Sequence, residues 1–537
     1  MEKQNDIQNT PQTAASLVRH GSALSLLTLI SRILGLVREM VKARFLGTTA
    51  LSDAFSVAFL LPNLFRRLFA EGSISVAFIP TFKEHLLEAN RDKARQAAVR
   101  EFLSCMFTFL TFFVTLMVCA GILAAPFLVK IFGLEEFDET VLLTRIMFPF
   151  LGFISLAALF QGVLNSLHIF TPSGLAPILL NIVTIVCAYA LGPYTANPAR
   201  AMAIGILIGG FLEAAIQLPF ILKKGHSFFI TGLKRAFNNP GVKKVLRLIA
   251  PTIIGMAAYQ LNDLVSTALA GRAGEGIVSS LQYSLRLQEL FLGVFAVSIG
   301  TVLLPNLTEY AKTSRWEIFN KRLVSSINII ALITIPITFF SLAQGQNLIR
   351  LLFQSRSFDE TSVALTLAAF VFHMPGLLFI ALNRIIAPAF YAQSDTKSPT
   401  AAGIISFAVN ISLAAILVGR FRGAGIAFAL SFASAVNTVL LFIFLRKNPN
   451  ISLGSVIAPA LLYSLKILLL SAAAVIPVYF LSPVLCDIFA GHSRIISFGA
   501  PLAVNAVIYG ALGVLMLAAV KDKNLTGIIN MIKKKEN

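Results

Sequence analysis

The sequence predicts an all-α polytopic membrane protein. Of its 537 residues, 57% are hydrophobic and only 13% are charged. The mean hydropathy of +0.81 is far from that of a soluble domain. A helix that spans a bilayer needs about 20 mostly apolar residues. Such stretches follow one another along nearly the whole chain, with short polar breaks between them.

These stretches predict about fourteen transmembrane helices. They cover residues 20–45, 51–70, 101–129, 139–166, 174–192, 201–222, 245–270, 276–304, 321–344, 361–390, 399–418, 423–445, 455–481 and 495–519. The first helix is expected to stay in the protein, because residues 1–16 are polar and no small-residue cleavage site follows. The cysteines show no CxxC spacing and are interpreted as small core residues. They are Cys105, Cys119, Cys187 and Cys486.

An internal repeat divides the chain. A shift of about 225 residues aligns "VAFIPTFKE" (76–84) with "TVLLPNLTE" (301–309), and "LLNIV" (179–183) pairs with "AVNIS" (408–412). Chance similarity between apolar helices is the alternative. The repeat predicts two pseudo-symmetric six-helix lobes plus two C-terminal helices. The expected parts are a tail (1–19), an N-lobe (20–222), a basic linker (223–244), a C-lobe (245–445), helices thirteen and fourteen (446–519) and a basic tail (520–537).

Loop charges predict the orientation, because Lys and Arg concentrate in cytoplasmic loops. The loop 223–247 contains basic residues and no acid, so it and both termini are placed in the cytoplasm; its basic residues are Lys223, Lys224, Lys234, Arg235, Lys243, Lys244 and Arg247. This topology and anionic lipid headgroups account for the net charge of +19. We therefore expect no nucleic-acid partner.

The first predicted helix carries an unusual number of charges for a membrane span. On a helical wheel its polar residues share a sector of about 120°, while its apolar residues occupy the other side. The polar set is Thr28, Ser31, Arg32, Gly35, Arg38, Glu39 and Lys42. Each charge costs about 2.5–3.5 kcal/mol at the bilayer centre, so this sector is expected to face a wet or protein-lined interior. Arg44 falls on the apolar side near the helix end and is left out of the site.

Helix two repeats this pattern. Its polar residues share a sector of about 80° and are Asp53, Ser56, Asn63, Arg67 and Glu71. Arg66 lies about 60° beyond Asn63 on a straight helix, but Pro62 is expected to bend this helix. Either Arg66 or Arg67 could therefore face the interior.

Helix eight and helix ten supply charges from the second lobe. Ser279, Gln282, Arg286 and Glu289 share one face of helix eight, and Arg384 precedes Pro388 on helix ten. For any single pair, such as Arg38 with Asp53 or Arg286 with Glu289, a structural ion pair is an equal alternative. Together, however, the arginines of these helices outnumber the acids. This surplus predicts an anionic guest, because the planar guanidinium fork suits phosphate or carboxylate oxygens.

Three segments resemble those of a known family: "SRILGLVRE", "SDAFSVAFLLPNLFRRLFAEGSISVAFIP" and "APAFYAQSDTKSP". They are similar to the signature segments of the MurJ (MviN) lipid II flippases, in the multidrug/oligosaccharidyl-lipid/polysaccharide exporter superfamily. The resemblance covers essentially the whole chain, including the helix count. It implies a transporter of the bacterial inner membrane that moves undecaprenyl-pyrophosphate-linked peptidoglycan precursor (lipid II) to the periplasmic leaflet. Contact with the cell-wall synthesis machinery would fit this role.

The resemblance also implies site residues. The substrate-binding set is Arg32, Arg38, Arg66, Arg286 and Arg384 with Ser31 and Asn63, and the supporting acids are Glu39, Asp53, Glu71 and Glu289. The family pattern favours Arg66 over Arg67. Some members resemble sodium-binding proteins, with carboxylates on helices seven and eleven. Here Asp263 and Asn410 could contribute oxygen ligands, but Ala414, one turn after Asn410, offers none.

Other function classes fit less well. A cation-coupled drug exporter of the same superfamily should favour acidic or aromatic cavities and usually stops at twelve helices, and a flippase for another lipid-linked oligosaccharide is the nearer alternative. A membrane glycosyltransferase should carry catalytic carboxylates in sizeable loops. The six histidines show no metal-binding spacing and no phosphate-binding loop is present, so no metal, cofactor or enzyme activity is expected. Transport would then depend on membrane potential, an ion gradient or substrate flux.

Overall fold

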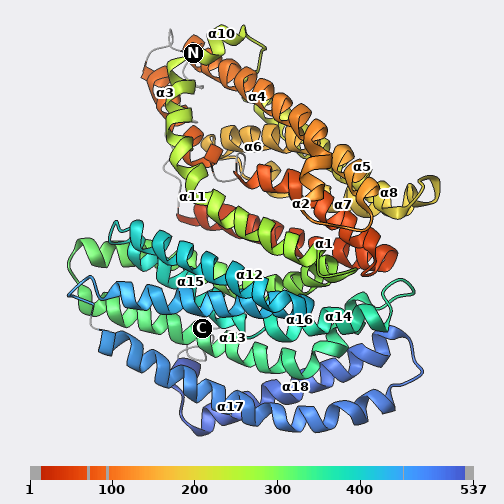
Figure 1. Ribbon diagram of the computed structural model, residues 1–537. Helices are drawn as coiled ribbons and strands as arrows, with labels where there is room; N and C mark the ends of the chain where they lie inside the picture. The colour runs from red at the N-terminus through yellow and green to blue at the C-terminus, as the bar shows by residue number, and fades with distance from the viewer. Residues whose placement is uncertain (1–13, 69–72, 92–95, 452, 527–537) are drawn as a thin grey trace. The chain divides into compact units, whose positions relative to one another are not determined.

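The computed structural model describes residues 14–68, 73–91, 96–451 and 453–526, and in these ranges the chain forms helices and no strands (Figure 1). This confirms the predicted all-α class. In the first half of the chain the helices are α1 (Ala14–Leu46), α2 (Ala50–Arg66), α3 (Ser73–Arg91), α4 (Gln96–Lys130), α5 (Phe137–Met147), α6 (Phe150–Ser166), α7 (Thr171–Ala190), η3 (Gly192–Tyr194), α8 (Pro198–Ala215), α9 (Leu218–Lys223), α10 (Leu233–Asn238) and α11 (Pro240–Gly271).

The second half contains fewer and longer helices. They are α12 (Ile277–Lys312), α13 (Trp316–Phe353), α14 (Glu360–His373), α15 (Gly376–Tyr391), α16 (Lys397–Leu445), α17 (Leu453–Ile488) and α18 (Arg494–Ala519). Among the described residues, eight helices are long and apolar enough to cross a membrane, or nine if the bent pair α14 and α15 is one span. These spans do not include α1, α2, α11 and α12, four helices that carry charged or amide residues of the predicted sites.

The boundaries differ from the prediction mainly at prolines. Helix four is interrupted before α6, whose N-cap is Pro149, and helix ten bends by 46° at the break before α15, whose N-cap is Pro375. Proline lacks the backbone N–H that a continuous helix needs, so these interruptions follow from the sequence. The segment after helix two was expected to be a loop, but it contains α3. That helix is too polar for a spanning pattern, so the hydropathy reading missed it.

Helices eleven and twelve were expected to be separated by residues 419–422. In the structure they follow one another without a loop inside α16, which is interrupted only by the non-helical backbone of Arg422 (φ 44°, ψ −128°). The chain reverses direction there. The close approach of Gly425 to Leu417 shows this reversal: a Cβ atom at Gly425 would be only 2.9 Å from the Cβ of Leu417. The predicted break therefore exists as a sharp reversal.

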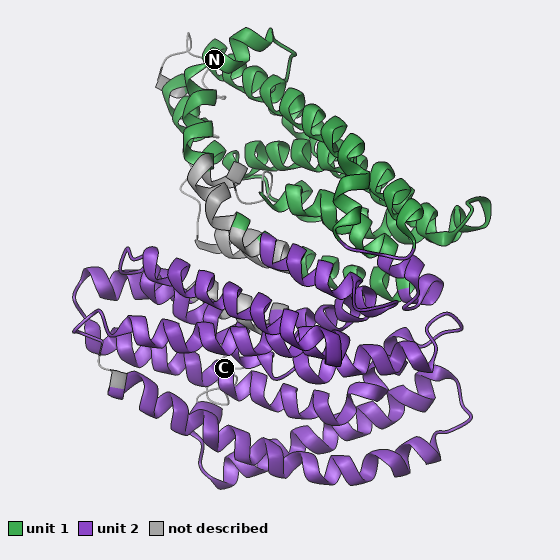
Figure 2. Ribbon diagram, in the orientation of Figure 1, with its two compact units in different colours: residues 1–42, 54–131, 136–260 green, residues 43–53, 132–135, 261–537 purple. Residues whose placement is uncertain are grey.

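The chain forms two compact units (Figure 2). Unit 1 comprises residues 1–42, 54–131 and 136–260, and unit 2 comprises 43–53, 132–135 and 261–537. In unit 1, the rings of Phe78, Phe82 and Phe102 stack with centroids 5.4 to 6.5 Å apart. In unit 2, the fully buried Tyr283 contacts Phe353 and Phe358. Each unit thus has its own aromatic core.

The cysteine prediction is only partly correct. Cys105 and Cys187 are buried and Cys486 is half-buried, but Cys119 is exposed. Cys119 shares a face of α4 with Leu116 and Leu123, which are also exposed. In a membrane protein this outward apolar face suits lipid, so an apolar segment alone did not distinguish core from lipid contact.

The start of the C-terminal tail is fastened to α17. The buried Asp522 accepts a hydrogen bond from Lys466 Nζ at 2.7 Å and one from the hydroxyl of Tyr463 at 3.2 Å. Burial by itself would raise the pKa of the Asp522 carboxyl. The hydrogen bond from Lys466 and the backbone N–H groups of Asn524 and Leu525 nevertheless hold this pKa below its ordinary value.

Replacing Lys466 with methionine is expected to destabilise the protein by roughly 1 kcal/mol at neutral pH, because the buried carboxylate loses a charged donor. A carboxyl whose pKa is lowered in the folded state stabilises it above the unfolded pKa and stops doing so as pH falls through the folded pKa. The difference from the unmodified protein should therefore shrink in acid. Thermal unfolding of the detergent-solubilised protein at neutral and acidic pH measures this effect. Lys523→Met is the control; an equal loss in both variants contradicts the prediction.

Candidate functional site

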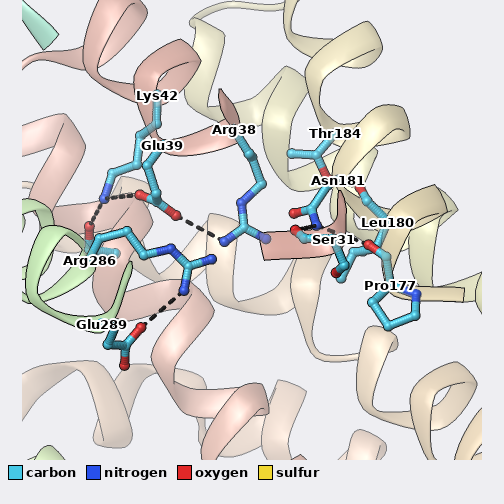
Figure 3. A network of polar contacts seen from close by, with 11 residues as sticks. Ser31, Arg38, Glu39, Lys42, Pro177, Leu180, Asn181, Thr184, Arg286 and Glu289 are labelled. Atoms are coloured by element: carbon cyan, nitrogen blue, oxygen red, sulfur yellow. Dashed lines mark hydrogen bonds and ion pairs between the residues drawn. The ribbon is translucent and has the colours of Figure 1, made fainter. Parts of the chain in front are cut away.

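The charged residues of α1 form a compact ion-pair network within unit 1 (Figure 3). Arg38 Nη2 lies 2.9 Å from Glu39 Oε1, and Lys42 Nζ lies 3.9 Å from Glu39 Oε2. The side chains of Arg38 and Glu39 are each 14% exposed. One carboxylate is thus shared between two cations.

Residues of α2 and α7 complete this group. Lys42 is buried and donates a hydrogen bond to Ser56 Oγ at 2.7 Å, and the guanidinium of Arg38 lies 5.7 Å from the ring centre of Phe59. On α7, Asn181 Nδ2 donates to the backbone carbonyl of Ser31 at 3.3 Å (Figure 3). Ser31 therefore takes part through its backbone.

The helical phase of α1 explains this arrangement. Leu26, Leu29, Ile30 and Ile33 are exposed, whereas Lys42 is buried. A 3.6-residue period places these apolar side chains away from the polar sector. Arg32 is half-buried and has no ion pair within the described ranges, and Arg44 is exposed.

The end of α2 positions a further arginine. Arg66 Nε donates to Asn63 Oδ1 at 2.7 Å, one turn earlier, and both side chains are half-buried. Arg67 follows the last residue of α2 and is also half-buried. Glu71 lies outside the described residues. The structure thus brings Asn63 and Arg66 together.

Asp53 has a role that the sequence did not reveal. Its side chain is 1% exposed, and its two oxygens accept hydrogen bonds from the backbone N–H groups of Gly276 and Ser279, each at 2.8 Å. Asp53 therefore caps the N-terminus of α12, where a carboxylate also interacts favourably with the helix dipole. Gly276, the N-cap residue, has φ 77° and lies against the carbonyl of Thr48, so it can supply no capping side chain.

Two other arginines of the predicted set belong to unit 2. Arg286 Nη1 lies 3.1 Å from Glu289 Oε2, one turn later on α12. The side chain of Arg286 is 33% exposed and that of Glu289 is 54% exposed, so this pair is accessible. Arg384 on α15 is exposed and makes no ion pair with a described residue.

The candidate sodium ligands Asp263 and Asn410 lie on α11 and α16. Asn410 is buried, and its Nδ2 donates to Asn262 Oδ1 at 2.7 Å and to Ser266 Oγ at 3.2 Å. Asp263 is half-buried. Within the described part of the chain, no group of three or more His, Cys, Asp or Glu side chains could hold a metal ion. The sodium site stays a prediction.

Comparison with known proteins gives consistent results. A family model described as "Lipid II flippase MurJ" matches residues 42–498. The chain is 44% identical over 513 residues to a protein of Treponema pallidum named "Probable lipid II flippase MurJ", covering 95% of this chain and 97% of that protein. It is also 34% identical over 429 residues to "Lipid II flippase MurJ" of Burkholderia cenocepacia, covering 78% and 82%.

Solved structures share the fold. One is named "Lipid II flippase MurJ, inward closed conformation", with a TM-score of 0.73, 23% identity and coverage of 93% of this chain and 99% of that chain. An inward-facing multidrug transporter of the MATE family has a TM-score of 0.64 and 14% identity, covering 79% and 98%. Both support a polytopic transporter fold.

Proposed function

Because the chain belongs to the lipid II flippase MurJ family, we propose that it is a lipid II flippase: a transporter, not an enzyme, which moves the undecaprenyl-pyrophosphate-linked headgroup from the cytoplasmic to the periplasmic leaflet. The observation that carries this function is the set of incompletely compensated arginines on helices of a membrane protein. Arg32 and Arg384 make no ion pair with a described residue, and Arg38 shares Glu39 with Lys42.

The pyrophosphate is the natural ligand of these arginines. We infer that Arg38, Arg66 and Arg286 bind its oxygens, with Arg32, Arg384, Ser31 and Asn63 contributing further contacts. The geometry of Arg38 supports this role, because its guanidinium is partly exposed and its carboxylate partner is the neighbouring residue. An arriving phosphate could replace Glu39 without leaving that carboxylate unpaired, since Lys42 stays beside it.

The acids would return the arginines to their resting state after release. Glu39 can pair again with Arg38, and Glu289 with Arg286, at the distances found here. Asp53 is a further candidate for this task, and Glu71 is a further supporting acid that lies outside the described residues. The capping contacts of Asp53 favour a structural role for it, because both of its oxygens already accept backbone hydrogen bonds.

Transport is proposed to follow alternating access, in which the site opens to one side of the membrane at a time. The polyprenyl tail needs no polar path and could remain in lipid or follow α17 and α18. Those two helices expose large apolar side chains, among them Leu461, Leu462, Leu469, Phe480 and Val507. We infer that the protein lies in the bacterial inner membrane with both termini in the cytoplasm. We also propose the cell-wall synthesis machinery as its partner.

The fold is shared with a multidrug transporter, so the second candidate function is that of a cation-coupled drug exporter. A cavity for cationic drugs should be acidic or aromatic, whereas the α1 and α2 groups are rich in arginine. A flippase for another lipid-linked oligosaccharide would use the same pyrophosphate contacts. Competition between lipid II and other polyprenyl pyrophosphates in a binding assay separates the two flippase functions.

A leaflet-accessibility assay tests the proposal directly. Cells depleted of this protein should accumulate lipid II in the inner leaflet, out of reach of a reagent that modifies only periplasmic lipid II, and re-expression should restore modification. The reason is that a charged disaccharide-peptide headgroup crosses a bilayer core very slowly unaided. Undiminished periplasmic lipid II after depletion would overturn the proposed function.

A further inference from the structure

The break between α14 and α15 exposes backbone carbonyls that other helices satisfy. Pro375 interrupts the helix there, so the carbonyls of the last turn of α14 lose their usual partners. Ser431 Oγ on α16 donates to the carbonyl of Phe372 at 2.6 Å, whereas the carbonyl of Met374 accepts the backbone N–H of Leu377 at 3.0 Å. In a bilayer such groups must be satisfied internally.

The α12 helix supplies the remaining contacts. Gln288 Nε2 donates to the carbonyl of His373, and Ser284 Oγ lies 2.7 Å from His373 Nδ1 in a second hydrogen bond. Ser284, Gln288 and His373 are all buried, and all of these residues belong to unit 2. Gly376 permits the close approach of Ser431, because a Cβ atom at Gly376 would collide with the Ser431 side chain.

These contacts fix the rotation of α12 about its own axis. Ser284 and Gln288 are one turn apart and face the break, while Arg286 lies about 160° to 200° around the helix from them. Accordingly, Ser284 and Gln288 are buried and Arg286 is partly exposed. A helix held by two side chains on one face has little freedom to rotate about its axis. The contacts of Ser284 and Gln288 therefore also determine the direction in which Arg286, on the opposite face, points.

We propose that Gln288 and Ser284 are positioning residues, which latch α12 to the α14/α15 break and thereby aim Arg286 at the substrate pyrophosphate. The inference rests on the proposed function, since it assigns the purpose of the latch to that site. Neither residue touches the substrate.

A double-mutant cycle tests the latch. The affinity of the purified full-length protein for undecaprenyl pyrophosphate is measured for Gln288→Leu, Arg286→Ala and the double variant. Gln288→Leu should weaken binding roughly tenfold, and the double variant should bind no more weakly than Arg286→Ala alone, because an absent guanidinium needs no positioning. Additive losses, or unchanged binding by Gln288→Leu, would overturn the inference.

Two comparisons separate positioning from plain stability. Gln344→Leu removes an equally buried glutamine of α13 that bonds to Asn347, and it should lower the unfolding temperature while leaving affinity unchanged. Ser284→Thr keeps the hydroxyl and should restore most of the affinity lost in Ser284→Ala. If Gln344→Leu weakens binding as much as Gln288→Leu, the effect is general destabilisation and the positioning role is refuted.

A distance measurement keeps the latch testable even if the proposed substrate is wrong. Spin labels at the exposed positions Glu309 on α12 and Tyr391 on α15, in a chain without its native cysteines, report the geometry of the two helices within unit 2. Gln288→Leu should broaden the distance distribution, and Gln344→Leu should not. An unchanged distribution refutes the latch, whereas normal binding by Arg286→Ala with a broadened distribution refutes only the assigned pyrophosphate contact.

Discussion

Replacing Arg38 with alanine is expected to abolish lipid II transport while leaving membrane insertion intact, and Arg286→Ala should do the same. Removing one partner of a desolvated, charge-assisted contact costs about 2–5 kcal/mol, which corresponds to a loss of substrate affinity of about 30-fold or more. The protein should still insert, because neither substitution removes an exposed apolar residue. Complementation of flippase-depleted cells, combined with quantification of protein in the membrane, measures both properties.

Controls on the same helix sharpen this prediction. Arg44→Ala removes an exposed arginine from the end of α1 and should support normal transport. Arg38→Lys keeps the charge but not the planar fork, so it should recover only part of the activity. Normal transport by both Arg38→Ala and Arg286→Ala would show that the pyrophosphate is not held by these two residues.

Replacing Asp53 with alanine should have the second-largest effect. The substitution leaves two buried backbone N–H groups at the start of α12 without acceptors, a loss on the order of 2 kcal/mol. Because the same helix carries Arg286, transport should fall together with the unfolding temperature. Asp53→Asn retains one good acceptor oxygen, so its transport and its unfolding temperature should lie between those of Asp53→Ala and the unmodified protein.

Thermal unfolding of the solubilised protein and the leaflet assay measure the two effects of Asp53→Ala. Asp138→Ala, an exposed acid near the start of α5, is the matched control and should change neither. If Asp53→Ala unfolds at the unmodified temperature but loses transport, the carboxylate acts in the substrate site and its capping contacts are secondary.

The fold was largely predictable from local sequence. Long apolar runs predicted α4 and α18 to within about five residues, because hydropathy is a property of neighbouring residues, whereas α13 and α17 extend beyond their predicted ends. The phase of α1 was also readable, since the side of a helix on which Leu29 and Lys42 lie depends only on spacing. The arginine surplus predicted an anionic guest, which agrees with the pyrophosphate-linked substrate that the family segments imply.

Contacts between distant segments were not predictable. The hydrogen bond from Gly276 to Asp53 joins residues 223 positions apart, and that from Gln288 to His373 joins residues 85 apart. A wheel places Asp53 in a polar sector but cannot tell a cap for another helix from a ligand for an anion. One signal was available: a helix that begins after "AGEG" has a glycine at its N-cap and needs an acceptor from elsewhere.

The reversal at Arg422 limits how this part of the chain can change during evolution. Most membrane proteins absorb insertions in the loops between spans. Within α16, however, the two helical halves adjoin a single non-helical residue, so no loop is present there that could accommodate an inserted residue. One inserted residue would rotate the second half by about 100°. Ser431 would then turn away from the α14/α15 break, and the length of this segment should be as constrained as any of its side chains.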